Sequence, residues 1–230
     1  MEYRHELKFL VPEHQLALIE FRLKMVMKQD VHQSEGKYNI RSLYFDDLFD
    51  SCMHENENGV DARKKYRIRI YDKNADVIKL EKKMKLRGMT KKVVTTIEKE
   101  SCIKYMYAQS PCVSDMNSEL EKELYVQMKS KGMTPVIIVE YERTAFVEKN
   151  GNIRITFDRN ISGCDKVTSF LEKNISLVPL LPQGWHVLEV KYDEYFPDYI
   201  KDVLEIGSLQ RTAFSKYYYA RDYKNKLMRG

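Results

Sequence analysis

Cationic and apolar side chains alternate along two adjacent stretches of the sequence, KYRIRIYDKN and ADVIKLEKKMK, which together run from Lys65 to Lys85. Side chains of a β-strand point alternately to its two faces, so one face of each stretch carries nearly all of its charge. The residues on these charged faces are Lys65, Arg67, Arg69, Lys79, Glu81, Lys83 and Lys85. Cations crowded in this way repel one another unless anions or carboxylates neutralise them. The two stretches are therefore predicted to form a hairpin whose charged face binds anions.

The same alternation recurs elsewhere in the chain. Charged residues share one face in Glu6/Lys8, Arg154/Asp158 and Glu189/Lys191. For any one strand, the simplest explanation is a sheet with one face in water. Several such strands weaken that explanation, because a solvated face usually mixes Thr, Ser and Gln with its charges. Here Arg predominates, and Arg binds phosphate oxygens bidentately. The alternative is a closed barrel with a charged interior.

About eight strands are available to carry these faces. They are expected at residues 3–11, 39–47, 65–74, 75–85, 91–97, 136–147, 153–160 and 185–192. Most of them follow one another as hairpins, and the Asn150-Gly151-Asn152 turn is one of the hairpin signals. We therefore expect an α+β fold with a largely antiparallel sheet.

Helix signals separate the strands. Pro12 and Pro197 stand at the first turns of helices, and Ser118 with Glu121 forms a capping box for a helix that ends at Gly132. The helix after Pro197 is expected to stop at Gly207. Further helices are expected at residues 98–109, 167–173 and 214–227, and residues 50–59 are expected to be a long connection.

Composition limits the class of protein. The 230 residues are 43% hydrophobic, which is ample for one domain with a buried core. The 39 Lys and Arg residues exceed the 34 Asp and Glu by only five, which does not suit a broadly polycationic nucleic-acid binder. The four cysteines form no CxxC pair and the N-terminus has no apolar leader, so a cytoplasmic location is expected. No stretch approaches the roughly 18 apolar residues of a membrane span, so direct membrane insertion is not expected.

Other common catalytic motifs are missing from the sequence. The nine glycines build neither GxxxxGK nor GxGxxG, and the five histidines form no HExxH pair. A P-loop, a Rossmann nucleotide site and a histidine-based metal site are therefore disfavoured. The tyrosines Tyr217 to Tyr219 have the spacing of a packed helix face rather than of a base-stacking platform.

An ordered set of short motifs resembles a known family. In sequence order they are YRHELKFLV, RSLYFDD, KYRIR, LEKK, YERTAF, IRITFD, VLEVKY and FSKYYYA. Together they resemble the catalytic domain of the vacuolar transporter chaperone (VTC) polyphosphate polymerases, which are triphosphate tunnel metalloenzymes related to the CYTH proteins. The resemblance covers essentially the whole chain. Because no regulatory or membrane segment accompanies it, the chain is most similar to the free-standing bacterial versions.

The resemblance implies a single domain over residues 1–230: an antiparallel, eight-stranded, closed β-tunnel with surrounding helices. Such a tunnel binds triphosphate and a divalent metal, Mn²⁺ or Mg²⁺, held by a carboxylate that corresponds to Glu189. The expected catalytic residues are Arg67, Arg69, Lys83, Arg154 and Lys216. The expected substrate-binding residues are Lys8, Lys91, Arg143, Lys191 and Ser215.

The chain departs from the family pattern at two positions. Polymerases carry a basic residue where Asn56 stands and a Lys where Ala213 stands. Arg211 is a candidate replacement for the latter. These departures bear on processive polymerisation and leave the expected fold unchanged.

Several roles remain open at this point. Glu6 and Glu81 are either second metal ligands or carboxylates that balance neighbouring cations. Lys65, Lys79 and Lys85 share charged faces but have no counterpart in the family pattern, which suggests tunnel mouths.

Three functions remain to be separated. The first is a polymerase that transfers the γ-phosphate of ATP to a polyphosphate chain, the second a triphosphatase, and the third a non-catalytic polyanion binder. The expected partners are ATP, triphosphate or polyphosphate, without nucleic acid. Positioning and charge neutralisation supply most of the rate in phosphoryl transfer, so no protein nucleophile is required.

Overall fold

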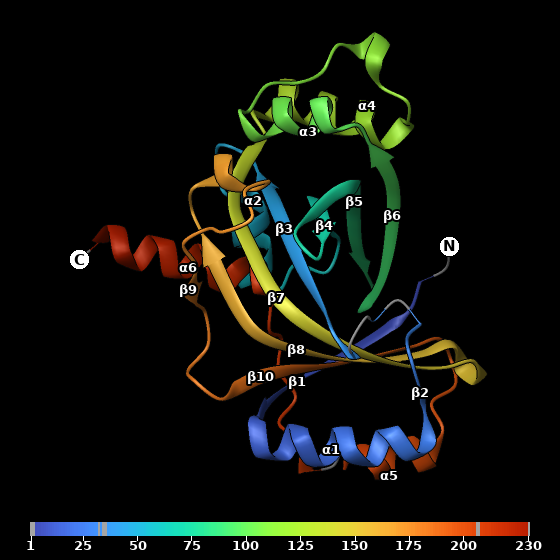
Figure 1. Ribbon diagram of the computed structural model, residues 1–230. Helices are drawn as coiled ribbons and strands as arrows, with labels where there is room; N and C mark the ends of the chain where they lie inside the picture. Colours follow the sequence, from blue (N-terminus) through green and yellow to red (C-terminus); the bar gives the residue numbers. More distant parts are fainter. Residues whose placement is uncertain (1–2, 32, 34–35, 206–207, 230) are drawn as a thin grey trace.

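A computed structural model describes residues 3–31, 33, 36–205 and 208–229, and it consists of one antiparallel sheet wrapped into a barrel with helices around it (Figure 1). The strands follow the order β1-β10-β8-β7-β3-β4-β5-β6. Their bounds, in that order, are His5–Pro12, Trp185–Tyr192, Ile153–Cys164, Thr134–Glu148, Tyr38–Asp46, Arg63–Tyr71, Asn74–Leu86 and Met89–Ile97. Two short strands, β2 (Lys28–Gln29) and β9 (Val178–Pro179), pair with β7 and β8.

The edge strands β1 and β6 meet at one bridge within the described residues. Arg4, just before β1, and Thr90 of β6 exchange backbone hydrogen bonds of 3.0 and 2.9 Å. The predicted eight-stranded antiparallel tunnel is confirmed, although this seam is closed by a single bridge and not by a continuous ladder.

Helices α1 (Glu13–Val26) and α5 (Asp198–Leu204) cover one end of the barrel's outer face (Figure 1). Leu16, Ile19 and Leu23 recur at helical spacing in α1, and all three are buried against Phe9 of β1 and other apolar side chains of the strands. Glu205 caps α5 in a left-handed conformation, with φ 50°, so this helix ends before the predicted stop at Gly207, which lies outside the described residues.

Helices α3 (Lys99–Met106) and α4 (Glu119–Lys131) cover the opposite end, against β4, β5 and β6 (Figure 1). The predicted capping box is present: Ser118 Oγ accepts a hydrogen bond of 3.2 Å from the Glu121 amide. Gly132 ends α4 with φ 63°, a conformation that favours glycine.

The inner face of the barrel is apolar where helices α2 (Ser51–Glu57) and α6 (Lys216–Arg229) pack. Phe214, two residues before α6, and Tyr217, in its first turn, are buried with Tyr44, Val139 and Tyr141 of the strands. Two predictions from the sequence about helices were wrong. Residues 50–59, predicted to be a connection, contain α2, and the backbone amides of Cys52 and Met53 in its first turn donate hydrogen bonds to the Asp46 carboxylate. Residues 167–173, predicted to be a helix, contain only a 3-10 turn, Val167–Ser169. Among the described helices, none is long and apolar enough to span a bilayer.

A buried arginine on the outer face of the barrel binds the segment that follows β8. Arg41 of β3 is fully buried, and its Nε lies 2.5 Å from Glu140 Oε2. Its guanidinium also donates to the carbonyls of Phe170 at 2.9 Å and Lys173 at 3.2 Å. Removing one partner of a buried ion pair leaves an uncompensated charge, so this clamp contributes strongly to the fold.

Arg41→Met is expected to lower the free energy of unfolding by about 3 kcal/mol or more, because Glu140 keeps its charge in a buried place. Chemical denaturation measures this loss. Lys73→Met is the matched control, since Lys73 Nζ lies 3.6 Å from the same carboxylate but is 40% exposed. That substitution should cost less than about 1 kcal/mol. Equal losses in the two variants would contradict the assignment.

Candidate functional site

Seven strands direct charged residues toward one another across the inside of the barrel, because the strand register puts these residues on the same face. The strands are β1, β4, β5, β6, β7, β8 and β10. Arg67 lies opposite Glu81 and Tyr44, and Lys83 lies opposite Lys65. On the other side of the seam, Lys8 lies opposite Glu189. The alternation seen in single stretches therefore continues from strand to strand around the barrel.

Glu81 of β5 is the centre of the first cluster. Its carboxylate accepts hydrogen bonds from Arg67 Nε at 2.7 Å and Lys92 Nζ at 3.0 Å, and Arg69 Nη1 lies 3.7 Å away. Burial alone would raise the pKa of Glu81, but Arg69, Arg67 and Lys92 hold it well below its usual range. Glu81 therefore balances cations.

The guanidinium groups of this cluster are also oriented by hydroxyls. Arg67 Nη1 donates to the Tyr44 hydroxyl at 3.0 Å. Arg69 donates to Ser42 Oγ at 3.1 Å and to the Tyr141 hydroxyl at 3.2 Å. Both arginines are thus held in fixed positions on the inner face.

Glu6 and Glu189 stand on the adjacent strands β1 and β10 and share one lysine. Lys8 Nζ lies 3.1 Å from Glu6 Oε1 and 3.7 Å from Glu189 Oε2. Lys83 reaches Glu6 from β5, with distances of 2.9 and 2.7 Å to its two oxygens, and Lys191 pairs with Glu189. This second cluster joins strands on both sides of the seam.

Burial and neighbouring charges set the protonation of this second cluster. Burial would raise the pKa of Glu6 and of Glu189, but the ammonium groups around them lower both values. Burial lowers the pKa of Lys83 to about 8, with repulsion from Lys8 and Lys191 opposed by Glu6 and Glu189. Because the pKa values of Glu6 and Glu189 are lowered, both carboxylates are ionised at neutral pH.

Asp158 of β8 forms the third cluster and is fully buried. Arg143 donates to its two oxygens at 2.6 and 2.8 Å, and Lys216 Nζ lies 2.5 Å from Oδ2. Burial would raise the pKa of Asp158, but Arg143 and Lys216 lower it. Both cations also lie over the Tyr141 ring, 5.3 and 4.8 Å from its centroid.

Arg154 lies farther along β8, away from the other clusters. Its Nη2 lies 2.5 Å from Asp30 Oδ2 and donates to the Tyr38 hydroxyl at 3.1 Å. Taken together, the inward cations outnumber the carboxylates Glu6, Glu81, Asp158 and Glu189. The inner face therefore carries a surplus of positive charge suited to a polyanion.

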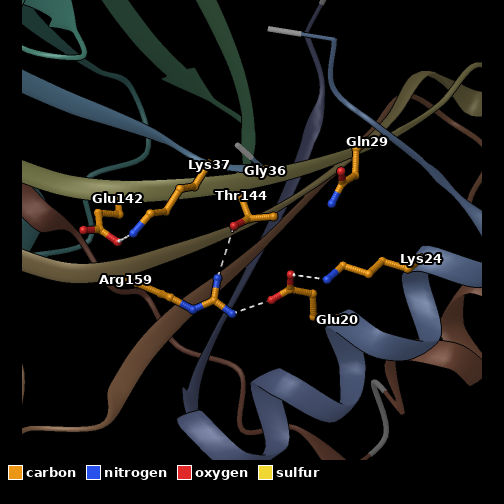
Figure 2. Close-up of a pocket in the computed structure, with 8 residues that line it drawn as sticks. All are labelled: Glu20, Lys24, Gln29, Gly36, Lys37, Glu142, Thr144 and Arg159. Atoms are coloured by element: carbon orange, nitrogen blue, oxygen red, sulfur yellow. Dashed lines mark hydrogen bonds and ion pairs between the residues drawn. The ribbon is translucent and has the colours of Figure 1, made fainter. Parts of the chain in front are cut away.

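A separate pocket of about 320 Å³ lies on the outer side of the barrel, beside α1, β7 and β8 (Figure 2). Its charged groups are already paired with one another: Arg159 pairs with Glu20 at 2.6 Å, and Lys37 pairs with Glu142 at 2.9 Å (Figure 2). The inner face remains the stronger candidate for a functional site.

Comparison with known proteins decides the family. The family model of the VTC domain matches residues 3–223. The chain belongs to the VTC domain family. The resemblance noted in the sequence is thereby confirmed. No curated protein matches the chain.

Solved structures share the fold of this VTC domain. A putative adenylyl cyclase from Hippeastrum, reported to have a dominant triphosphatase activity, is 14% identical with a TM-score of 0.55, and the match covers 96% of each chain. A putative adenylate cyclase from Bacillus halodurans is 11% identical with a TM-score of 0.53, and covers 93% of this chain and 94% of that one. At these identities the likeness shows the fold alone.

The structure brings most of the expected VTC site residues to the inner face. They are Lys8, Arg67, Arg69, Lys83, Arg143, Arg154, Glu189, Lys191, Ser215 and Lys216. Lys91 is not among them: it lies opposite Met84, and its ammonium lies 5.8 Å from the centroid of the Tyr3 ring. Its neighbour Lys92 lies opposite Lys83 and bonds Glu81 instead.

Two further residues differ from what the sequence suggested. Arg211, the candidate replacement for Ala213, is exposed and bridges Phe9 through its backbone. Lys65, which the sequence suggested only for a tunnel mouth, contacts Ser215 and Asn56 at the end of the inner face. Alternation had placed Lys65 on the charged face, but the family pattern had no role for it.

The carboxylates of this VTC domain can supply only part of the ligand set of a divalent metal. Within the described part of the chain, no group of three or more His, Cys, Asp or Glu side chains could hold a metal. Glu6 and Glu189 nevertheless converge on the Lys8 ammonium, and both are ionised. Mg²⁺ is commonly held by one or two carboxylates together with substrate phosphates. These two carboxylates fit a metal that takes its remaining ligands from substrate and water.

Glu81→Gln is expected to lower the free energy of unfolding by about 3 kcal/mol in phosphate-free buffer, because three cations lose their shared partner. Added inorganic triphosphate should reduce the difference in the free energy of unfolding between this variant and the unaltered chain, since the anion replaces the missing negative charge. Thermal denaturation with and without triphosphate measures both effects.

The matched control for Glu81 is Glu123→Gln. Glu123 pairs with Lys64 and Lys82 on the outer face of the same strands and is 32% exposed. The Glu123→Gln substitution should lower the free energy of unfolding by about 1 kcal/mol, with or without triphosphate. An identical triphosphate effect in both variants would show that Glu81 does not balance the anion-binding cations.

Proposed function

We propose that this VTC domain is a metal-dependent phosphotransferase that extends polyphosphate with the γ-phosphate of ATP. The surplus of inward cations, held in place by buried carboxylates, is the observation that supports this most strongly. A triphosphate carries the charge needed to complete the neutralisation, and membership in the VTC family supports the polymerase over other uses of the same surface.

The chain's own residues bind and orient the substrate. Arg67 and Arg69 present guanidinium groups that bind phosphate oxygens bidentately, and Lys8, Lys83 and Lys216 add point charges. A divalent metal, Mn²⁺ or Mg²⁺, held by Glu189 together with Glu6, would neutralise phosphate oxygens.

The acceptor in this proposal is the terminal phosphate of a polyphosphate chain, which attacks the γ-phosphorus of ATP. The bond between the γ-phosphorus and the bridging oxygen of ADP breaks as the new anhydride bond forms. Charge neutralisation in a fixed geometry supplies most of the rate, so no side chain acts as a nucleophile.

Triphosphate hydrolysis is the second candidate, in which water takes the place of the chain end. Asn56 and Ala213 favour it, because they stand where polymerases carry basic residues. The triphosphatase activity reported for the Hippeastrum protein of the same fold also motivates it.

One assay distinguishes these activities. Pure protein is incubated with ATP and Mn²⁺, and the products are separated on a gel stained for polyphosphate. Long chains support the polymerase, whereas release of phosphate alone supports the hydrolase. Tight binding of polyphosphate without turnover would overturn both and leave a polyanion-binding protein.

Glu189→Gln is expected to reduce turnover at least about a hundredfold while leaving metal-free binding of triphosphate intact, because the variant loses a metal ligand and not a cation. Turnover and calorimetric binding of triphosphate in chelator are the two measurements. Glu142→Gln, on the outer face and paired with Lys37, is the control and should behave as the unaltered chain. Full turnover in Glu189→Gln would remove Glu189 from the metal site.

A further inference from the structure

Lys65 of β4 lies where three elements meet at the end of the inner face covered by α6. Its ammonium donates to Asn56 Oδ1 of α2 at 3.0 Å and to Ser215 Oγ at 3.4 Å. It also lies 4.8 Å from the centroid of the Tyr217 ring. The strand register sets it directly opposite Lys83.

The partners of Lys65 differ from those of the other inward cations. Lys8, Lys83, Lys191 and Lys216 each pair with a carboxylate. In the described part of the chain, the two oxygens that receive hydrogen bonds from Lys65 are neutral. An ammonium in this place gains more from an arriving anion than one that already has a carboxylate partner.

We propose that Lys65 is a phosphate-binding residue of this chain, which holds a phosphate of the bound triphosphate beside Ser215. The contacts of Lys65 support this placement, because its ammonium already lies between neutral groups of α2 and the segment before α6. Asn56 Oδ1 and Ser215 Oγ each accept a hydrogen bond from Lys65, and neither oxygen neutralises its charge. The inference rests on the proposed function only in taking a triphosphate as the ligand.

The protonation of Lys65 gives the proposal a distinctive signature. Burial, followed by repulsion from Arg63, Lys8 and Lys83, lowers the pKa of Lys65 to about 7. The charged and titratable groups that face it are Arg63 on its own strand, Lys8 of β1, Lys83 of β5, Cys52 and Glu55 of α2, and Tyr217 of α6.

The sign of the pH effect follows from this pKa. Above neutral pH the free protein holds Lys65 largely uncharged, and a bound phosphate favours the ammonium form. Binding of triphosphate at pH 8 therefore takes up a proton at Lys65, and affinity falls as the pH rises through 7.

Calorimetric binding of inorganic triphosphate to the full chain tests the proposal with three variants. Lys65→Met is expected to weaken binding about tenfold to a hundredfold, the range for one charge-assisted hydrogen bond. Lys64→Met is the matched control, because Lys64 is the next residue on the same strand and pairs with Glu123 on the outer face. It should change affinity less than about threefold.

Lys65→Arg provides the readout that a structural role would not change. An arginine stays protonated, so this variant should retain affinity at pH 7 and take up fewer protons than the unaltered chain at pH 8. Proton uptake is measured from the binding enthalpy in buffers of different ionisation enthalpy. The Lys65→Arg comparison applies even if Lys65→Met does not fold.

The outcomes separate this proposal from the proposed function. Unchanged affinity in Lys65→Met, or identical proton uptake in Lys65→Arg and the unaltered chain, would overturn the role of Lys65 alone. Failure of the unaltered chain to bind triphosphate would overturn both proposals.

Discussion

The structure depends on neutralising the cations that seven strands direct into one barrel. Unpaired, these charges would repel one another in a partly dehydrated space, and the barrel would be unstable. Four buried carboxylates, Glu6, Glu81, Asp158 and Glu189, each bind at least two of the cations. The same ion pairs fix the directions of the arginine and lysine side chains. They therefore stabilise the barrel without a ligand and also orient its cations for binding an anion.

Helices provide the remaining stability from outside. Helices α1 and α5 cover the apolar outer faces of β1, β8 and β10, while α3 and α4 cover those of β4, β5 and β6. The apolar outside of each strand thus allows the inside to be charged. Among the described helices, α2 and α6 pack on the inner face, where their apolar residues lie next to the cations. This arrangement closes the space around Lys65 and Ser215 and explains why burial lowers the pKa of Lys65.

Alternation in the sequence was sufficient to predict the strands and the charged face, because side-chain direction in a strand is a local property. It predicted Arg67, Arg69, Lys83 and Glu189 on the inner face. The family resemblance placed Lys91 in the site, whereas the structure turns Lys92 inward, because the inward position depends on register. The two-residue turn at Arg87 and Gly88, both with positive φ, sets Leu86 opposite Met89 and so turns Lys92 inward. Helix α2 and the contacts of Lys65 depend on packing between distant segments, which no local pattern reports.

Within the described residues, the seam between β1 and β6 has fewer backbone hydrogen bonds than the ladders between the other neighbouring strands of the barrel. Elsewhere each strand is joined to its neighbour by a ladder, but here two backbone hydrogen bonds between Arg4 and Thr90 join the edges, a net contribution on the order of 2 kcal/mol. Glu6 reinforces the join by accepting from Lys83 of β5 and from Thr90 Oγ1 at 3.2 Å. A ligand that draws Lys83 away from Glu6 would therefore remove one of the contacts that hold the two edges of the sheet together.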